Sequence, residues 1–165
     1  MNDDPDALMS QIEEYLADGR ILHLATVSNG LPWLSHLWYA KGPANLSVVF
    51  TSHRARRHSK EIIAHQAVAG GVVAIPLDGL GQKVRGLSFE GNAQEATGTL
   101  LAAAYESYAN RWPKVRDMFT VRDIEAGATQ MRMYLITLSR VVLFDEVNYP
   151  SNPRQELVIN SPSNE

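Results

Sequence analysis

Residues 51–60, with the sequence Thr-Ser-His-Arg-Ala-Arg-Arg-His-Ser-Lys, form the most basic segment of the chain. They include four of its 15 lysines and arginines and no acidic residue. Thr51 and Ser52 add hydroxyl groups, and the planar fork of Arg56 or Arg57 can donate two parallel hydrogen bonds to a phosphate. Lys60 adds a further positive charge. The segment therefore predicts a phosphate pocket, with a solvated basic face and a nucleic-acid contact as the alternatives.

Three potential metal ligands, His58, Glu61 and His65, also begin in this segment. In a helix their offsets of three and seven residues return to one face, and histidine and carboxylate groups can bind zinc or iron. However, Arg56 and Arg57 precede His58, and their charges oppose a cation. We therefore predict no metal site and interpret the three residues as polar groups on a short helix.

Residues 35–39, Ser-His-Leu-Trp-Tyr, have the alternation of a strand. His36 and Trp38 would leave one face, while Ser35, Leu37 and Tyr39 would leave the other. Two large side chains with polar tips can line a cleft for a flat ligand, or they can pack against other parts of the protein.

A group of aromatic and arginine side chains lies near Pro113, which should end a helix. Such side chains are common in interfaces and in pockets for anionic substrates, and tyrosines packed on the rest of the fold are the alternative. The group comprises Tyr105, Tyr108, Arg111, Trp112 and Arg116.

The elements that must position these groups are short strands joined largely by hairpins. A first helix should begin at Pro5, capped by Asp4, and end at Gly19, and Asn29-Gly30 should form a hairpin turn. The other expected strands are 21–27, 33–40, 46–51, 68–75, 83–96 and a pair within 132–147; the other helices end near 66, span 99–108 and lie within 115–128. This order favours a mainly β, α+β fold: an antiparallel barrel with peripheral helices.

The chain ends in a segment rich in proline, serine and asparagine. We expect one domain over residues 1–148 and an irregular C-terminal tail over 149–165, with residues 157–159 docking as an edge strand. Gly86 and Gly91 fall inside the expected strand 83–96, where glycine usually marks a bulge or a close approach of another backbone or a ligand.

Composition narrows the possible functions. The 165 residues have 45% apolar and 20% charged side chains, which is typical of a globular domain. The absence of cysteine excludes disulfides, thiolate metal sites and cysteine nucleophiles, and is compatible with the reducing cytoplasm. The net charge of −3 argues against a nucleic-acid-binding protein. The acidic N-terminus and the lack of a long apolar stretch predict neither a secretory signal nor a membrane span.

These pieces together resemble the pyridoxamine 5′-phosphate oxidase-like, FMN-binding split-barrel proteins, over about residues 8–147. The resemblance rests on the order and spacing of four short motifs. They are Val48-Val49-Phe50-Thr51 leading to Arg57-His58, Ala67-Val68-Ala69-Gly70, Arg85-Gly86-x-x-Phe89-x-Gly91, and Tyr108-x-x-Arg111-Trp112-Pro113.

The resemblance implies a six-stranded antiparallel split barrel that forms a homodimer, with FMN in the clefts between subunits. It implies that the FMN phosphate is surrounded by Thr51, Ser52, Arg56, Arg57 and Lys60. The isoalloxazine would lie along Ser35, His36, Leu37 and Trp38, and Arg85 and Gly86 would approach the flavin. Tyr108 and Arg111 fall near positions that hold the substrate's phosphate in the family's oxidases.

The implied function is a flavin-dependent oxidoreductase acting on a small substrate. The family's oxidases end in a segment containing arginine and tryptophan, which residues 148–154 do not match, so the resemblance does not extend to pyridoxal phosphate synthesis. The alternatives are a non-catalytic flavin carrier or sensor, and a related barrel that binds deazaflavin or haem, with His36 as a possible haem ligand.

Overall fold

The structure is a computed structural model that describes residues 5–159. Its helices are α1 (Pro5–Asp18), α2 (Arg57–Ala64), α3 (Gly98–Arg111) and α4 (Val121–Glu125), with a 3-10 turn at Pro113–Asp117. Its strands are β1 (Ile21–Ser28), β2 (Leu31–Lys41), β3 (Ser47–His53), β4 (Ala67–Val73), β5 (Arg85–Glu95), β6 (Met131–Asp145) and β7 (Arg154–Val158). None of the helices within residues 5–159 is both long and apolar enough to cross a membrane.

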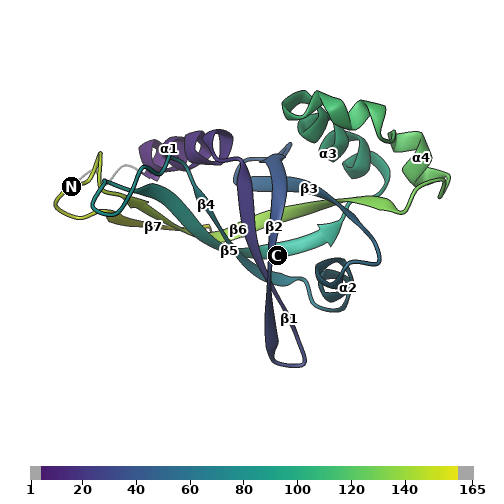
Figure 1. Ribbon diagram of the computed structural model, residues 1–165, viewed down its shortest axis with the longest axis horizontal. Coiled ribbons are helices and arrows are strands. Elements are labelled where there is room, and N and C mark those ends of the chain that lie inside the picture. The colour runs from purple at the N-terminus through teal and green to yellow at the C-terminus, as the bar shows by residue number, and fades with distance from the viewer. Residues whose placement is uncertain (1–4, 160–165) are drawn as a thin grey trace, which may run out of the picture.

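The strands form one antiparallel sheet in the order β3-β2-β1-β4-β5-β6-β7. An additional pairing of β3 with β6 closes the first six strands into a barrel and leaves β7 outside as an edge strand. Helices lie around the barrel, with α1 near β7 and with α3 and α4 on another side (Figure 1). The expected α+β split barrel with peripheral helices is confirmed.

Two hydrophobic clusters hold the fold together. One contains Leu22, Leu24 and Phe50 from the strands, together with Ile12 of α1. The other packs α3 and the segment after it against the opposite face of the strands. Because alternate residues of a strand point to opposite faces, Val48 and Phe50 of β3 belong to the first cluster and Val49 to the second. Strand β3 is thus buried on both faces and forms the joint between the barrel and α3.

Helix α1 ends where the sequence predicts. The backbone N–H of Gly19 donates to the carbonyl oxygen of Tyr15 at 3.0 Å, and a Cβ at Gly19 would lie 1.9 Å from Val72 Cγ1. Only glycine fits there, so the helix ends against β4. The proposed cap, Asp4, lies outside the described residues.

The turn between β1 and β2 also follows the sequence prediction. Asn29 and Gly30 have φ values of 50° and 75°, the backbone conformation that an Asn-Gly hairpin turn requires. The hairpin they close projects away from the rest of the molecule (Figure 1).

The end of the chain differs from the prediction in two ways. The expected strand pair within residues 132–147 is instead the single 15-residue strand β6, which pairs with β3 near its start and with β5 and β7 farther along. The tail expected to be irregular from residue 149 contains β7, so the edge strand begins at Arg154 rather than at Leu157. Residues 160–165 of that tail lie outside the described residues.

The two strand glycines have the close contacts that their positions predict. The register of β5 against β6 shifts between Glu90 and Gly91, and a Cβ on Gly91 would lie 2.5 Å from the carbonyl oxygen of Thr137. A Cβ on Gly86 would lie 2.7 Å from the carbonyl oxygen of Val72. Both positions therefore need glycine so that neighbouring strands can approach each other.

Candidate cofactor-binding site

The basic segment occupies the connection from the end of β3 to the start of α2. Arg56, the N-cap residue of α2, has an extended backbone conformation, and its side chain makes no hydrogen bond to the start of the helix. The first N–H groups of a helix have no partner within the helix, and they carry its positive partial charge. The start of α2, flanked by the exposed side chains of Arg56, Arg57 and Lys60, thus combines the features that favour an anion.

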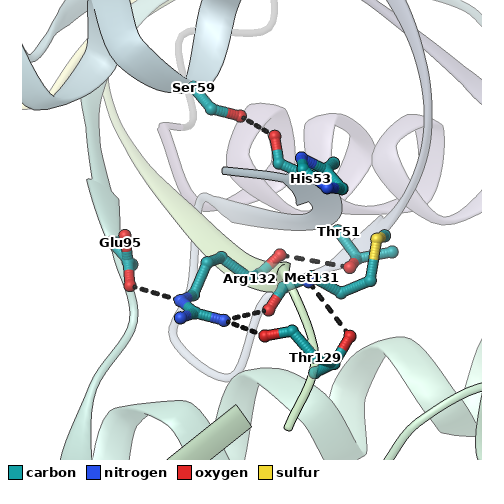
Figure 2. A network of polar contacts seen from close by, with 7 residues as sticks. All are labelled: Thr51, His53, Ser59, Glu95, Thr129, Met131 and Arg132. Carbon is teal, nitrogen blue, oxygen red and sulfur yellow. Dashed lines mark hydrogen bonds and ion pairs between the residues drawn. The ribbon is translucent and has the colours of Figure 1, made fainter. Parts of the chain in front are cut away.

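A network of hydrogen bonds fixes this connection on the barrel (Figure 2). The hydroxyl of Thr51 donates to the carbonyl oxygen of Arg132 at 3.1 Å, and the hydroxyl of Ser59 donates to that of His53 at 3.1 Å. The guanidinium of Arg132 is itself held by Glu95, with its Nε 3.2 Å from a carboxylate oxygen, and by the carbonyl oxygens of Thr129 and Met131. The end of β3 is therefore positioned by β6.

His58 lies buried between two serines that come from different strands. Its Nε2 is 2.7 Å from the hydroxyl oxygen of Ser52, and its Nδ1 is 3.0 Å from that of Ser35. Burial and the nearby charge of Arg56 lower the pKa of His58, and Glu61 opposes this effect without cancelling it. A neutral imidazole thus connects β2, β3 and α2.

Arg57 is already partly engaged by the protein. Its Nε donates to Glu61 at 2.7 Å, and its guanidinium carbon lies 4.5 Å from the centre of the Trp33 ring. Glu61 is buried and also accepts a hydrogen bond from Thr26 at 2.5 Å. Burial alone would raise the pKa of Glu61, but the hydrogen bonds from Arg57 and Thr26 outweigh burial, so the pKa lies below its usual value. Since the bond to Glu61 comes from Nε, the terminal nitrogens of Arg57 remain as donors that can face a ligand.

A pocket of about 430 Å³ lies beside this segment, with mainly apolar walls. The rings of Trp38 and Trp112 meet edge to face in its wall, with their centres 4.9 Å apart. Thr51 brings the end of β3 to the pocket, and burial raises the pKa of Tyr108 in its lining to about 12. The lining residues are His36, Leu37, Trp38, Thr51, Tyr108, Trp112, Lys114, Val115 and Met118.

The structure thus brings several of the predicted site residues together. His36, Leu37 and Trp38 of β2, Thr51 of β3 and Tyr108 of α3 all border one pocket. Ser35 points the other way, toward His58. The volume and the aromatic walls are typical of a site for a flat organic ligand.

Other predicted residues have different surroundings. The hydroxyls of Thr51 and Ser52, predicted as donors to a phosphate, instead make hydrogen bonds to Arg132 and His58. Arg111 donates to the carbonyl oxygen of Gly19 at 2.5 Å at the end of α1 and does not line the pocket. Carbonyl oxygens at a helix C-terminus attract a cation, so Arg111 joins α3 to α1 in this structure.

Arg85 and Gly86 lie apart from the basic segment, where β5 begins. The guanidinium of Arg85 packs over the ring of Tyr15 at 5.2 Å and borders a separate pocket of about 630 Å³ with Asp18 and Arg20. Within a single chain, none of the described pockets is lined both by Arg85 and by a residue of the Thr51–Lys60 segment.

Sequence reasoning missed the structural role of His58 and the aromatic wall formed by Trp112. The motif containing Trp112 was visible, but its contact with Trp38 depends on the packing of α3 against β2. The histidine and carboxylate triad does not converge: His58 and Glu61 are buried, whereas His65 is exposed. Among residues 5–159, no group of three or more histidine, aspartate or glutamate side chains is arranged to hold a metal ion.

The sequence matches no family model, and no curated protein matches it. Solved structures with low sequence identity do share its fold. A haem-binding protein from Mycobacterium smegmatis has a TM-score of 0.69 at 14% identity, and the match covers 89% of this chain. This chain spans only 57% of the length of that protein.

In two further matches, the aligned region covers most of the other protein as well. A candidate pyridoxamine 5′-phosphate oxidase from Listeria innocua has a TM-score of 0.61 at 14% identity, covering 82% of this chain and 97% of that one. An FAD-binding protein from Mesorhizobium loti has a TM-score of 0.59 at 17% identity, covering 80% of this chain and 90% of that one. With its six-stranded closed barrel, the chain has the split-barrel fold of the pyridoxamine 5′-phosphate oxidase-like proteins.

Proposed function

We propose that the protein binds FMN and acts as a flavin-dependent oxidoreductase on a small substrate. The observation that carries this proposal is the 430 Å³ aromatic pocket, whose lining includes Thr51 of β3, the strand that leads into the basic segment at the start of α2. The ring system would lie against Trp38 and Trp112, and the phosphate would lie at the helix N-terminus.

In this arrangement the residues around the ligand have different roles. Arg56, Arg57 and Lys60 supply positive charge to a phosphate of about −2. Lys114 and Tyr108 line the pocket, where their polar groups would orient a polar edge of the ligand. FMN would supply the redox chemistry when bound, while the protein supplies position and electrostatics.

We propose that the working form is a homodimer. The hairpin of β1 and β2 projects from the barrel, and it carries the exposed apolar side chains of Leu31, Trp33 and Leu34, which are 65%, 45% and 53% accessible. A second copy of the chain would cover this apolar arm. Such a dimer would also bring residues of one copy toward the pocket of the other.

A second candidate ligand is haem. His36 lines the apolar pocket and can supply an axial nitrogen to iron, and a haem-binding protein shares the fold. In that case the basic segment would face the propionates instead of a phosphate.

Mass spectrometry of the ligand released from freshly purified protein separates these candidates. We expect the mass of FMN and, after reconstitution with FMN and desalting, a retained flavin absorbance. Release of haem would show that haem, the second candidate ligand, occupies the site. Absence of flavin binding would overturn the proposal. Retained FMN without turnover of nicotinamide cofactors and electron acceptors would indicate a carrier or sensor.

A further inference from the structure

Two histidines face each other across the paired strands β1 and β2. The register places His23 directly opposite His36. Their Nδ1 atoms are 2.8 Å apart, and their rings meet at 83° with centres 4.9 Å apart. The pairing of β1 with β2 therefore brings the two ring nitrogens together at the surface of the barrel.

The separation of these nitrogens fits one bound metal ion. With metal–nitrogen bonds of about 2.05 Å, two atoms 2.8 Å apart subtend roughly 85° at the metal. Adjacent ligands in octahedral or tetragonal coordination subtend about 90°, whereas a tetrahedral ion would need the nitrogens about 3.3 Å apart. A small turn of the rings would aim both nitrogens at one ion, and imidazole nitrogens bind copper(II) more tightly than the other divalent first-row ions.

The surroundings leave the pair open to an ion. His36 is exposed, and His23 is partly exposed. His23 borders one pocket with Glu90 and Arg140, and another with Asp18, Arg20 and Arg85. Arg140 forms ion pairs with Glu90 at 2.9 Å and with Glu156 at 2.7 Å, which offsets its repulsion of a cation. The chain has no cysteine, so no thiolate competes with the histidines for the ion.

We propose that His23 and His36 together chelate one divalent transition-metal ion, with copper(II) bound most tightly. Without metal, one ring donates its Nδ1 proton to the other. On metal binding that ring carries its proton on Nε2 instead, so both Nδ1 lone pairs face the ion. Water fills the remaining positions, which leaves the ion open to exchange.

The proposal is tested by titrating the purified protein and three variants with copper(II) sulfate in a calorimeter. We expect one site per chain in the wild type, with affinity at least tenfold weaker in His23→Gln and in His36→Gln. His65→Gln, which removes an exposed histidine at the end of α2, should bind copper like the wild type. Electron paramagnetic resonance should show coupling of the bound copper to two nitrogens. Copper affinity unchanged in either variant of the pair would overturn the proposal.

A second measurement excludes misfolding and separates this site from the flavin site. Copper should raise the melting temperature of the wild type and of His65→Gln, but not that of His23→Gln. His23 does not line the 430 Å³ pocket, so His23→Gln should retain its flavin while losing the metal site. A copper-dependent rise in the melting temperature of His23→Gln equal to that of the wild type would contradict the assignment.

Discussion

The carboxylate of Glu61 accepts a hydrogen bond from Nε of Arg57 at 2.7 Å, one helical turn away on α2. The buried carboxylate fixes the direction of the guanidinium, while Trp33 packs against its face. Arg57 is therefore oriented before any ligand arrives, which lowers the entropy lost on binding a phosphate.

Substituting Arg57 and Glu61 one at a time should separate the contribution of Arg57 to FMN binding from the contribution of Glu61 to the orientation of Arg57. Arg57→Gln should weaken FMN binding at least about tenfold, because one charge-assisted hydrogen bond to a phosphate contributes about 1.5–3 kcal/mol. Glu61→Gln keeps Arg57 and should bind FMN within about threefold of the wild type, while losing about 1–3 kcal/mol of unfolding free energy. Equal FMN affinity in Arg57→Gln and the wild type, measured by fluorescence titration, would remove Arg57 from the site.

The pocket wall makes a second prediction. Trp38→Ala removes an aromatic face and should weaken FMN binding about 5- to 150-fold, since stacking on an aromatic side chain contributes about 1–3 kcal/mol. Leu80→Ala changes a fully exposed apolar residue outside the pocket and should leave affinity unchanged. If both variants bind FMN like the wild type, the flavin does not lie against Trp38.

The buried His58 predicts a pH dependence of stability. Its pKa in the folded protein lies below the 6.5 of an unfolded histidine, so the unfolded state takes up a proton first as the pH falls. The protein should therefore lose unfolding free energy below pH 6.5, at up to about 1.4 kcal/mol per pH unit from this group. Above pH 6.5 the group has no such effect.

Urea denaturation at pH 7.5, 6.5 and 5.5 measures this slope. His58→Gln should flatten it, whereas His65→Gln, which changes the exposed C-cap histidine of α2, should keep it. An unchanged slope in His58→Gln would show that other groups cause the acid destabilisation.

The buried carboxylate of Asp145, at the end of β6, predicts an effect on the free energy of unfolding that does not involve ligand binding. Asp145 is fully buried and accepts a hydrogen bond from the Tyr15 hydroxyl at 2.5 Å. Tyr15→Phe should lower the unfolding free energy by about 1.5–3 kcal/mol, the usual contribution of a hydrogen bond to a charged group. Tyr149→Phe removes a neutral bond to Gln11 and should cost only about 0.5–1.5 kcal/mol. Equal losses would contradict a charged Asp145.

The sequence predicts the elements of the barrel well where a local sequence signal and the surrounding packing require the same residue. Gly19 ends α1 because glycine both breaks a helix and fits against Val72, and Asn29-Gly30 marks its turn directly. The continuity of β6 was not predictable in this way. The polar residues Ser139 and Arg140 look like an interruption, yet Arg140 is held by ion pairs with Glu90 and Glu156 from the neighbouring strands.

The candidate site was predictable in its residue types but not in its hydrogen bonds. The basic segment identifies the start of α2, but the sequence does not reveal that the Ser52 hydroxyl pairs with His58. Nor does it show that Arg111 turns toward Gly19. Those directions depend on which strands and helices become neighbours after folding.

The central claim is that the chain recognises the phosphate of FMN. Calorimetric titration with FMN and with riboflavin, which shares the ring system but lacks the phosphate, tests it most directly. We predict that the wild type binds FMN at least about tenfold more tightly than riboflavin. Arg56→Gln should reduce this preference, while Arg122→Gln, an equal charge change on α4, should keep it. Equal affinity of the wild type for the two flavins, or no binding of either, would contradict the account.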